Sequence, residues 1–120
     1  MSMDTKEAVK AYQFGERAKS ELLLLSQLLT LVADLKDAER AGGKKVLLTA
    51  MEVIRIETEF AVRSTSLADF QRTVDRISEA ISLAESDQFF EASQKIGTAV
   101  SAATTAAQNG WQVLSGHGLL

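Results

Sequence analysis

Apolar residues recur along this chain every three or four positions, which is the spacing of one face of an α-helix. The densest apolar stretch is 22–33, where seven leucines and no charged residue occupy twelve positions. Charged residues lie directly before and after it. A helix of this composition must be covered on more than one side, so we predict that the other helices pack against it.

The first predicted helix runs over residues 5–40. Asp4, with a glutamate three residues later, has the form of a helix start. Gly42 and Gly43 are predicted to end the helix, because glycine tolerates the left-handed conformation found there. This helix is longer than the others. We therefore expect part of it to project or to bend near Gly15, unless a second chain covers it.

Two apolar stripes follow this first helix. One has small residues in its first half and leucines in its second, and small residues allow another helix to approach closely near Gly15. Its members are Ala8, Ala11, Gly15, Ala18, Leu22, Leu25, Leu29 and Val32. A 120-residue chain has difficulty covering both stripes. The second stripe is therefore a candidate interface, formed by Leu24, Leu28, Leu31 and Leu35.

Three more helices are predicted, over 45–63, 67–85 and 88–114, followed by a flexible tail over 115–120. Short connections make neighbouring helices antiparallel. We therefore predict one all-α domain over residues 1–120, an antiparallel up-down-up-down four-helix bundle with a long first helix. In the alternative, dimerisation completes the bundle and two chains share the leucine-rich segment.

One charged residue falls on the predicted inner face of the second helix. That face is expected to carry Val46, Ala50, Val53, Ile54, Glu57, Phe60 and Ala61. A buried carboxylate is costly unless it is paired or protonated. We predict that Glu57 is half-buried and reaches an arginine such as Arg76. The functional alternatives are a polar anchor for a ligand or a metal ligand, but the Glu-x-x-His pairs of a di-iron bundle are absent from the sequence.

The last 25 residues, 96–120, contain no Asp, Glu, Lys or Arg. We predict that this part of the fourth helix is buried in the bundle or in an oligomer interface. Trp111 is expected to close one end of the core. Alternatively it anchors an interface, since tryptophan is enriched at binding hot spots.

The composition excludes several classes of chemistry. Cysteine is absent, which excludes disulfides, thiol catalysis and cysteine metal sites. The only histidine, His117, lies in the predicted tail without a positioned partner. We therefore expect no enzymatic activity, no metal and no cofactor. A net charge of −3 argues against binding to nucleic acid or to an anionic membrane, and we expect a cytoplasmic protein.

These patterns predict a non-enzymatic interaction or assembly module that self-associates, with a dimer favoured. Two alternatives stay open. One is a small acidic chaperone or regulator that receives a partner helix in a groove. The other is a carrier of an apolar ligand, with a cavity around Ala99, Ala103 and Ala107.

Overall fold

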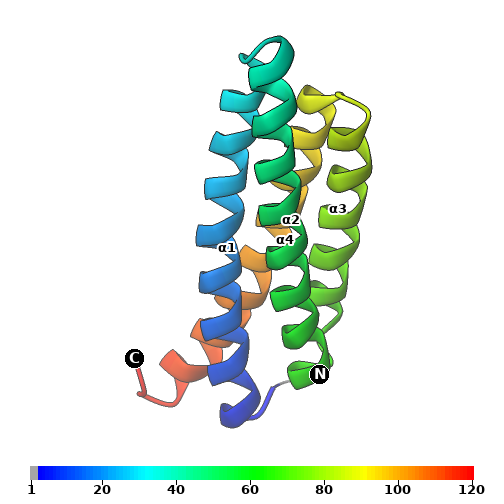
Figure 1. Ribbon diagram of the computed structural model, residues 1–120. Helices are drawn as coiled ribbons and strands as arrows, with labels where there is room; N and C mark the ends of the chain where they lie inside the picture. The colour runs from blue at the N-terminus through cyan, green and yellow to red at the C-terminus, as the bar shows by residue number, and fades with distance from the viewer. Residues whose placement is uncertain (1–2) are drawn as a thin grey trace.

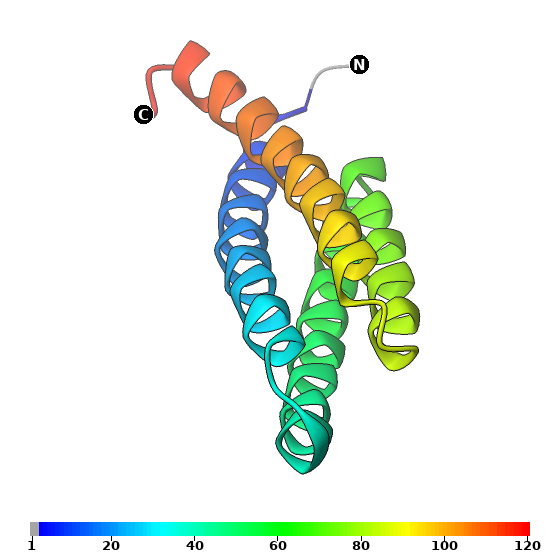
Figure 2. The same cartoon turned by 90° about the horizontal axis from the view of Figure 1, so that it is seen from above.

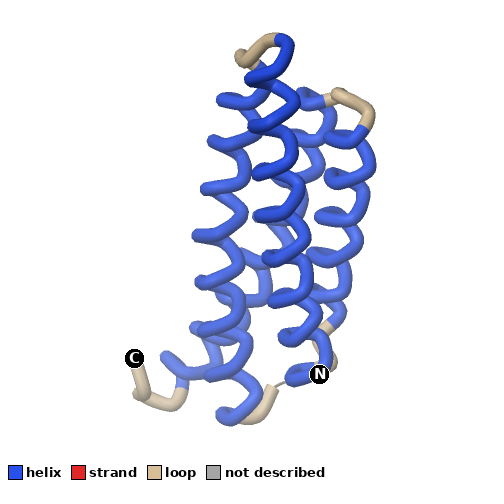
Figure 3. Tube along the Cα trace, viewed as in Figure 1, coloured by secondary structure: helices blue, strands red, loops and turns tan. Residues whose placement is uncertain are grey.

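The computed structural model describes residues 3–120, and within this range it contains four α-helices and no strand. The helices are α1 (Thr5–Ala33), α2 (Asp37–Thr65), α3 (Ala68–Glu85) and α4 (Phe89–Gly116). The chain ascends along α1, descends along α2, ascends along α3 and descends along α4 (Figure 1; Figure 3). The predicted all-α four-helix bundle is confirmed.

The four helices surround one core. α1 packs against α2 and α4, and α3 packs against the same two helices. The contact between α1 and α4 is the most extensive of the four. The bundle measures 54 × 22 × 18 Å, and the C-terminal part of α4 follows the N-terminal part of α1 beyond the end of α3 (Figure 2).

The core confirms the first stripe that the sequence predicts for α1. All eight residues of that stripe are buried. Leu22, Leu25 and Leu29 meet Leu47 and Met51 of α2 in the same apolar cluster. The half of the cluster on α3 and α4 is supplied by Ile77, Ala80, Ile81, Ala84, Phe89, Ala92, Ile96, Ala99 and Ala103.

α1 ends at Ala33, so the prediction of a first helix over 5–40 is wrong at its C-terminal end. The Arg40 guanidinium explains the break, because it donates hydrogen bonds to the carbonyl oxygens of Ala33 (2.7 Å) and Leu35 (2.9 Å). These bonds satisfy carbonyl groups that a helix end leaves without partners. The same guanidinium lies 5.5 Å from the centre of the Phe89 ring. α1 and α2 each have 29 residues, so the first helix is no longer than the second.

Gly42 and Gly43 lie inside α2 and do not end a helix. A Cβ atom placed on Gly43 would lie 2.8 Å from Cδ1 of Leu35 and 3.5 Å from Cγ2 of Val32. Gly43 therefore lets α2 pass close to the chain that leaves α1. α2 begins at Asp37, eight residues before the predicted start at residue 45.

The other predicted helix ends are close to those in the structure. Asp4 is the N-cap of α1, and its side chain accepts a hydrogen bond of 2.7 Å from the amide of Glu7. Ser66 ends α2 in a left-handed conformation, with φ of 58°. α4 continues through Gly110 to Gly116, so the tail predicted over 115–120 is helical in its first two residues.

Small residues join α1 and α4 at backbone distance. A Cβ atom on Gly15 would lie 2.8 Å from the carbonyl oxygen of Ala103, and one on Gly110 would lie 2.6 Å from that of Ala8. The predicted close approach near Gly15 is therefore confirmed. Ala103 and Ala107 lie directly against Gly15, and the cavity that an apolar-ligand carrier would need around them stays a prediction.

Candidate functional site

The buried side of α2 differs from the predicted one. Its buried residues are Leu47, Met51, Ile54, Thr58, Ala61 and Thr65. Val46, Val53 and Phe60, which the sequence predicts on the inner face, are exposed. Both sets of residues follow the helical spacing and both are largely apolar. Packing against α1 and α3 favours the set with Leu47 and Met51, so the neighbouring set points outward.

These exposed α2 residues lie on the same side of the bundle as the exposed leucines of α1. Along α1, Leu24 and Leu31 follow Arg17 at seven-residue intervals, and Arg17 contacts Glu57 of α2. Along α2, Glu57 lies four residues after Val53 and three before Phe60. We name this surface the α1/α2 apolar face, formed by Leu24, Leu28, Leu31, Val46, Val53 and Phe60.

The apolar side chains of the α1/α2 apolar face are unusually accessible to solvent. Leu24 is 53% exposed, Leu31 61%, Val46 69%, Val53 51% and Phe60 59%. Five large apolar side chains, each at least half exposed, therefore lie on two helices that pack against each other. Contiguous apolar surfaces on soluble proteins commonly mark sites of interaction.

The structure places the other candidate interface residues differently. Leu28 is half-buried and packs against the core. Leu35 is half-buried in the turn after α1, against Gly43. Trp111 is 48% exposed on α4 beside Tyr12 and therefore does not close the core. Its role as an interface anchor stays a prediction.

A hollow of about 210 Å³ opens between α1 and α2 at one end of this face. Phe60 belongs both to the hollow and to the α1/α2 apolar face. The lining comes entirely from these two helices: Phe14, Arg17, Ala18, Glu21, Glu57, Thr58, Phe60 and Ala61. The hollow therefore combines two aromatic rings with two carboxyl groups and one guanidinium.

Glu57 is half-buried in this hollow, with 37% of its side chain exposed. Its arginine is Arg17 of α1, whose Nη2 lies 3.3 Å from Oε1 of Glu57. The sequence prediction named Arg76, which pairs with Glu79 instead. The other oxygen of Glu57, Oε2, is buried and has no hydrogen-bond partner.

Glu21 is the second carboxyl group of the hollow, and sequence reasoning did not identify it. Burial, the hydrogen bond with Glu57 and the negative charge of Glu57 raise the pKa of Glu21 to about 7, and Arg17 opposes this shift. Nε of Arg17 lies 4.0 Å from Oε1 of Glu21, so one guanidinium serves both carboxyl groups. A proton held between them would give Oε2 of Glu57 the hydrogen bond that it lacks.

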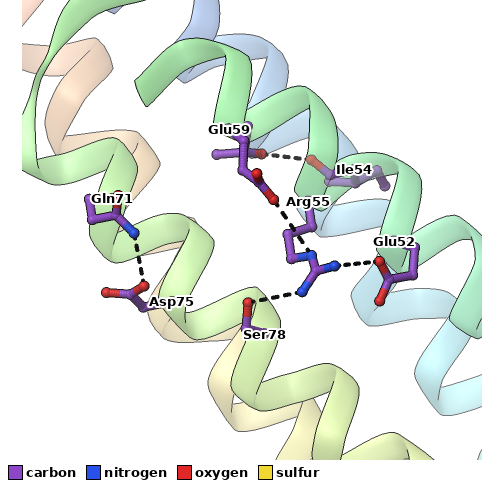
Figure 4. Close-up of polar contacts among 8 residues, drawn as sticks. Glu52, Ile54, Arg55, Glu59, Gln71, Asp75 and Ser78 are labelled. Atoms are coloured by element: carbon purple, nitrogen blue, oxygen red, sulfur yellow. Dashed lines mark hydrogen bonds and ion pairs between the residues drawn. The ribbon is translucent and has the colours of Figure 1, made fainter. Parts of the chain in front are cut away.

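The face between α2 and α3 has the opposite character. Arg55 of α2 lies at its centre and contacts Glu52 at 2.6 Å, Glu59 at 3.8 Å and the hydroxyl of Ser78 on α3 at 3.5 Å (Figure 4). Gln71 donates to Asp75 on the same face (Figure 4). These side chains are charged or polar and pair mainly with one another, although the buried Nε of Arg55 has no hydrogen-bond partner, so this face lacks the exposed apolar side chains of the α1/α2 apolar face.

Two further structural findings concern residues 3–120. No three His, Cys, Asp or Glu side chains in this part of the chain lie close enough together to hold a metal ion. None of the four helices there combines the length and the apolar character needed to cross a membrane.

Comparisons of the chain with protein-family models, with curated proteins and with solved structures find no match. The functional argument therefore depends on the surface itself. Part of that surface could have been found from the sequence, because Val46, Val53 and Phe60 follow one another at seven-residue intervals and share their side of the helix with a carboxylate.

Proposed function

We propose that this protein is a non-enzymatic assembly module, and that two copies associate through the α1/α2 apolar face. The observation that carries the proposal is the exposure of five large apolar side chains on two helices that pack against each other. They are Leu24 and Leu31 of α1 and Val46, Val53 and Phe60 of α2. Burying apolar surface contributes about 25 cal/mol per Å² to association, although only part of this remains after the costs of binding.

The dimensions of the bundle support an interface of ordinary size. Standard interfaces bury about 800 Å² on each partner. The bundle is 54 Å long and at least 18 Å wide, so one of its long sides exceeds that requirement. The apolar residues Leu24, Leu31, Val46 and Val53 lie along the side, and the charged groups Arg17, Glu21 and Glu57 gather beside Phe60. Interfaces commonly combine an apolar core with a polar rim.

The charges at the two ends support a second copy as the partner. Lys10 lies fourteen residues before Leu24 on α1, and Glu39 lies fourteen residues before Val53 on α2. At 1.5 Å per residue, each is about 21 Å from the middle of the face. Because α1 and α2 run in opposite directions (Figure 1), the two residues lie at opposite ends. A two-fold axis between Leu24 and Val53 would bring Lys10, which donates to the carbonyl oxygen of Ser64 in its own chain, opposite Glu39 of the partner subunit.

The test compares two adjacent leucines in solution. Leu24 belongs to the α1/α2 apolar face and is 53% exposed, whereas Leu23 is 49% exposed and points away from α2. We expect light scattering over a concentration series to give a dimer for the wild-type chain. Leu24→Lys should raise the dissociation constant at least tenfold, because a charge would be buried in the apolar interface.

Leu23→Lys is the matched control, since it makes the same chemical change at nearly the same exposure. It should leave the dimer intact. A wild-type chain that is monomeric at every concentration, or equal weakening by both substitutions, would overturn the proposal. A monomeric chain would then direct the search to a partner helix, for which the hollow between Phe14 and Phe60 is the nearest fit.

A further inference from the structure

We propose that Glu21 and Glu57 make self-association acid-dependent: the dimer is favoured when the two carboxyl groups hold one proton, and it weakens when both are ionised. This inference rests on the proposed function. It adds a regulatory device and assigns the chemical role of the hollow between α1 and α2.

The position of the carboxyl pair ties it to the α1/α2 apolar face. Glu57 lies between Val53 and Phe60 on α2, and Glu21 lies three residues before Leu24 on α1. Phe60 is part of the face and also lines the hollow that holds both carboxyl groups. A second copy seated on the face would therefore cover the mouth of the hollow and remove most of the water that now reaches the pair.

The charges around the pair do not balance when both carboxyl groups are ionised. Arg17 is the only cation among the residues that line the hollow, and it contacts both Glu21 and Glu57. Two nearby cations contact neutral groups and not the carboxyl pair: Lys10 donates to the carbonyl oxygen of Ser64, and the Arg63 guanidinium lies 4.9 Å from the centre of the Phe60 ring, at the edge of the hollow. Every residue that lines the hollow belongs to α1 or α2.

One uncompensated negative charge would therefore be buried in each subunit of a dimer formed at high pH. Burial of an uncompensated charge opposes association. Protonation of one carboxyl group removes that charge, and a protonated carboxyl group is a hydrogen-bond donor in a hollow where Oε2 of Glu57 has no partner. The pKa of Glu21, about 7 in the free subunit, rises further when water is excluded, because desolvation disfavours the ionised form.

The sign of the pH dependence follows from proton linkage. The dimer binds protons more tightly than the monomer does, so lowering the pH favours the dimer. A two-fold dimer contains two carboxyl pairs, and each contributes to the dependence. We expect the dissociation constant to rise at least tenfold from pH 6 to pH 8, on either side of the pKa of about 7.

The experiment measures the dissociation constant of the full chain by light scattering or sedimentation at both pH values and constant ionic strength. Glu57→Gln should associate equally well at both, because one carboxylate remains and Arg17 balances it. Glu52→Gln is the matched control, since Glu52 is on the same helix, is 42% exposed and contacts Arg55 on the opposite side of α2. It should keep the wild-type pH dependence. Circular dichroism of each variant verifies that it is folded.

The two proposals fail in different ways. A dimer that Leu24→Lys disrupts but that is equally strong at pH 6 and pH 8 overturns the acid dependence and leaves the assembly proposal standing. A Glu57→Gln variant that keeps the wild-type pH dependence has the same effect. A wild-type chain that is monomeric at both pH values overturns both proposals.

Discussion

The close contact between α1 and α4 makes a sharp prediction about two glycines of the same helix. Gly110 and Gly97 both lie inside α4. A Cβ atom on Gly110 would lie 2.6 Å from the carbonyl oxygen of Ala8 and 2.9 Å from the amide nitrogen of Tyr12. Both are backbone atoms and cannot turn aside as the end of a side chain can. A Cβ atom on Gly97 meets nothing within 4 Å.

The magnitudes follow from two opposing effects. Alanine gains about 1 kcal/mol over glycine inside a helix, and this gain applies at both positions. Overpacking costs about 1–3 kcal/mol, and it applies only at Gly110, where the rigidity of the neighbouring atoms places it near the upper end. We expect Gly110→Ala to lower the free energy of unfolding by about 1–2 kcal/mol. We expect Gly97→Ala to raise it by about 0.5–1 kcal/mol.

Urea unfolding followed by circular dichroism measures both changes, at a protein concentration low enough to keep the chain monomeric. The slope of the unfolding free energy against urea should stay the same in both variants, because the surface exposed on unfolding does not change. Each 1 kcal/mol corresponds to about 3–6 °C in melting temperature for a chain of this size. If Gly110→Ala is as stable as Gly97→Ala, the backbones of α1 and α4 are not in contact at Ala8, and the packing argument fails.

Two further substitutions test the hollow and the start of α2. Glu21 has a pKa that is higher in the folded than in the unfolded chain, so the folded chain binds more protons and its stability should fall as the pH rises from 4.5 to about 7. The ceiling is about 1.4 kcal/mol per pKa unit, and partial exposure beside Arg17 reduces the total to about 1–2 kcal/mol. Glu21→Gln should remove this decline in urea unfolding at low protein concentration, and a decline equal to that of the wild-type chain would contradict the assignment. Gly42 lies inside α2 with nothing within 4 Å of a Cβ position, so Gly42→Ala should raise the melting temperature through a gain of about 0.5–1 kcal/mol. A loss of stability would instead mean that Gly42 ends a helix in a left-handed conformation, as the sequence pattern indicates.

The sequence was sufficient to predict the packing of α1, because one of its stripes changes from small residues to leucines. Small residues such as Ala8, Ala11 and Gly15 allow a close neighbour, and large ones such as Leu22 and Leu25 require a wide core. Both consequences are seen in the structure, since the small half meets α4 at backbone distance and the leucine half meets α2 in the main cluster. Here the size of the side chains on α1 determines how closely another helix can approach, so this distance can be predicted without knowing which helix packs there.

The end of α1 could not be predicted in this way. Five of the seven residues 34–40 are charged, this segment is compatible with a helix, and the glycine pair that follows is a conventional stop signal. What ends α1 is a tertiary arrangement, in which Arg40 reaches back to the carbonyl oxygens of Ala33 and Leu35. In the same turn Gly43 passes close to the side chain of Leu35. Neither contact is visible until the chain has folded back.

The orientation of α2 is the most consequential difference between prediction and structure. Two sets of residues on α2 are apolar enough to form its buried side. One set contains Val46, Val53 and Phe60, and the other contains Leu47, Met51 and Ile54. Hydrophobicity alone does not show which of the two is buried. Glu57 gives the missing information, because it shares its side of the helix with Val53 and Phe60. A carboxylate at that position favours an outward orientation of the whole set.

The fold itself does not require the α1/α2 apolar face. Its exposed side chains contribute little to the core, so replacing Leu24 or Val53 with a polar residue should change the stability of the monomer by less than about 0.5 kcal/mol. The small residues of α1 are buried in its contact with α4, and Leu22, Leu25 and Leu29 are buried in the core. The remaining leucines therefore have no role within one chain that a polar residue could not fill. The proposed dimer accounts for their apolar character, because a second copy seated on the α1/α2 apolar face would cover these leucines.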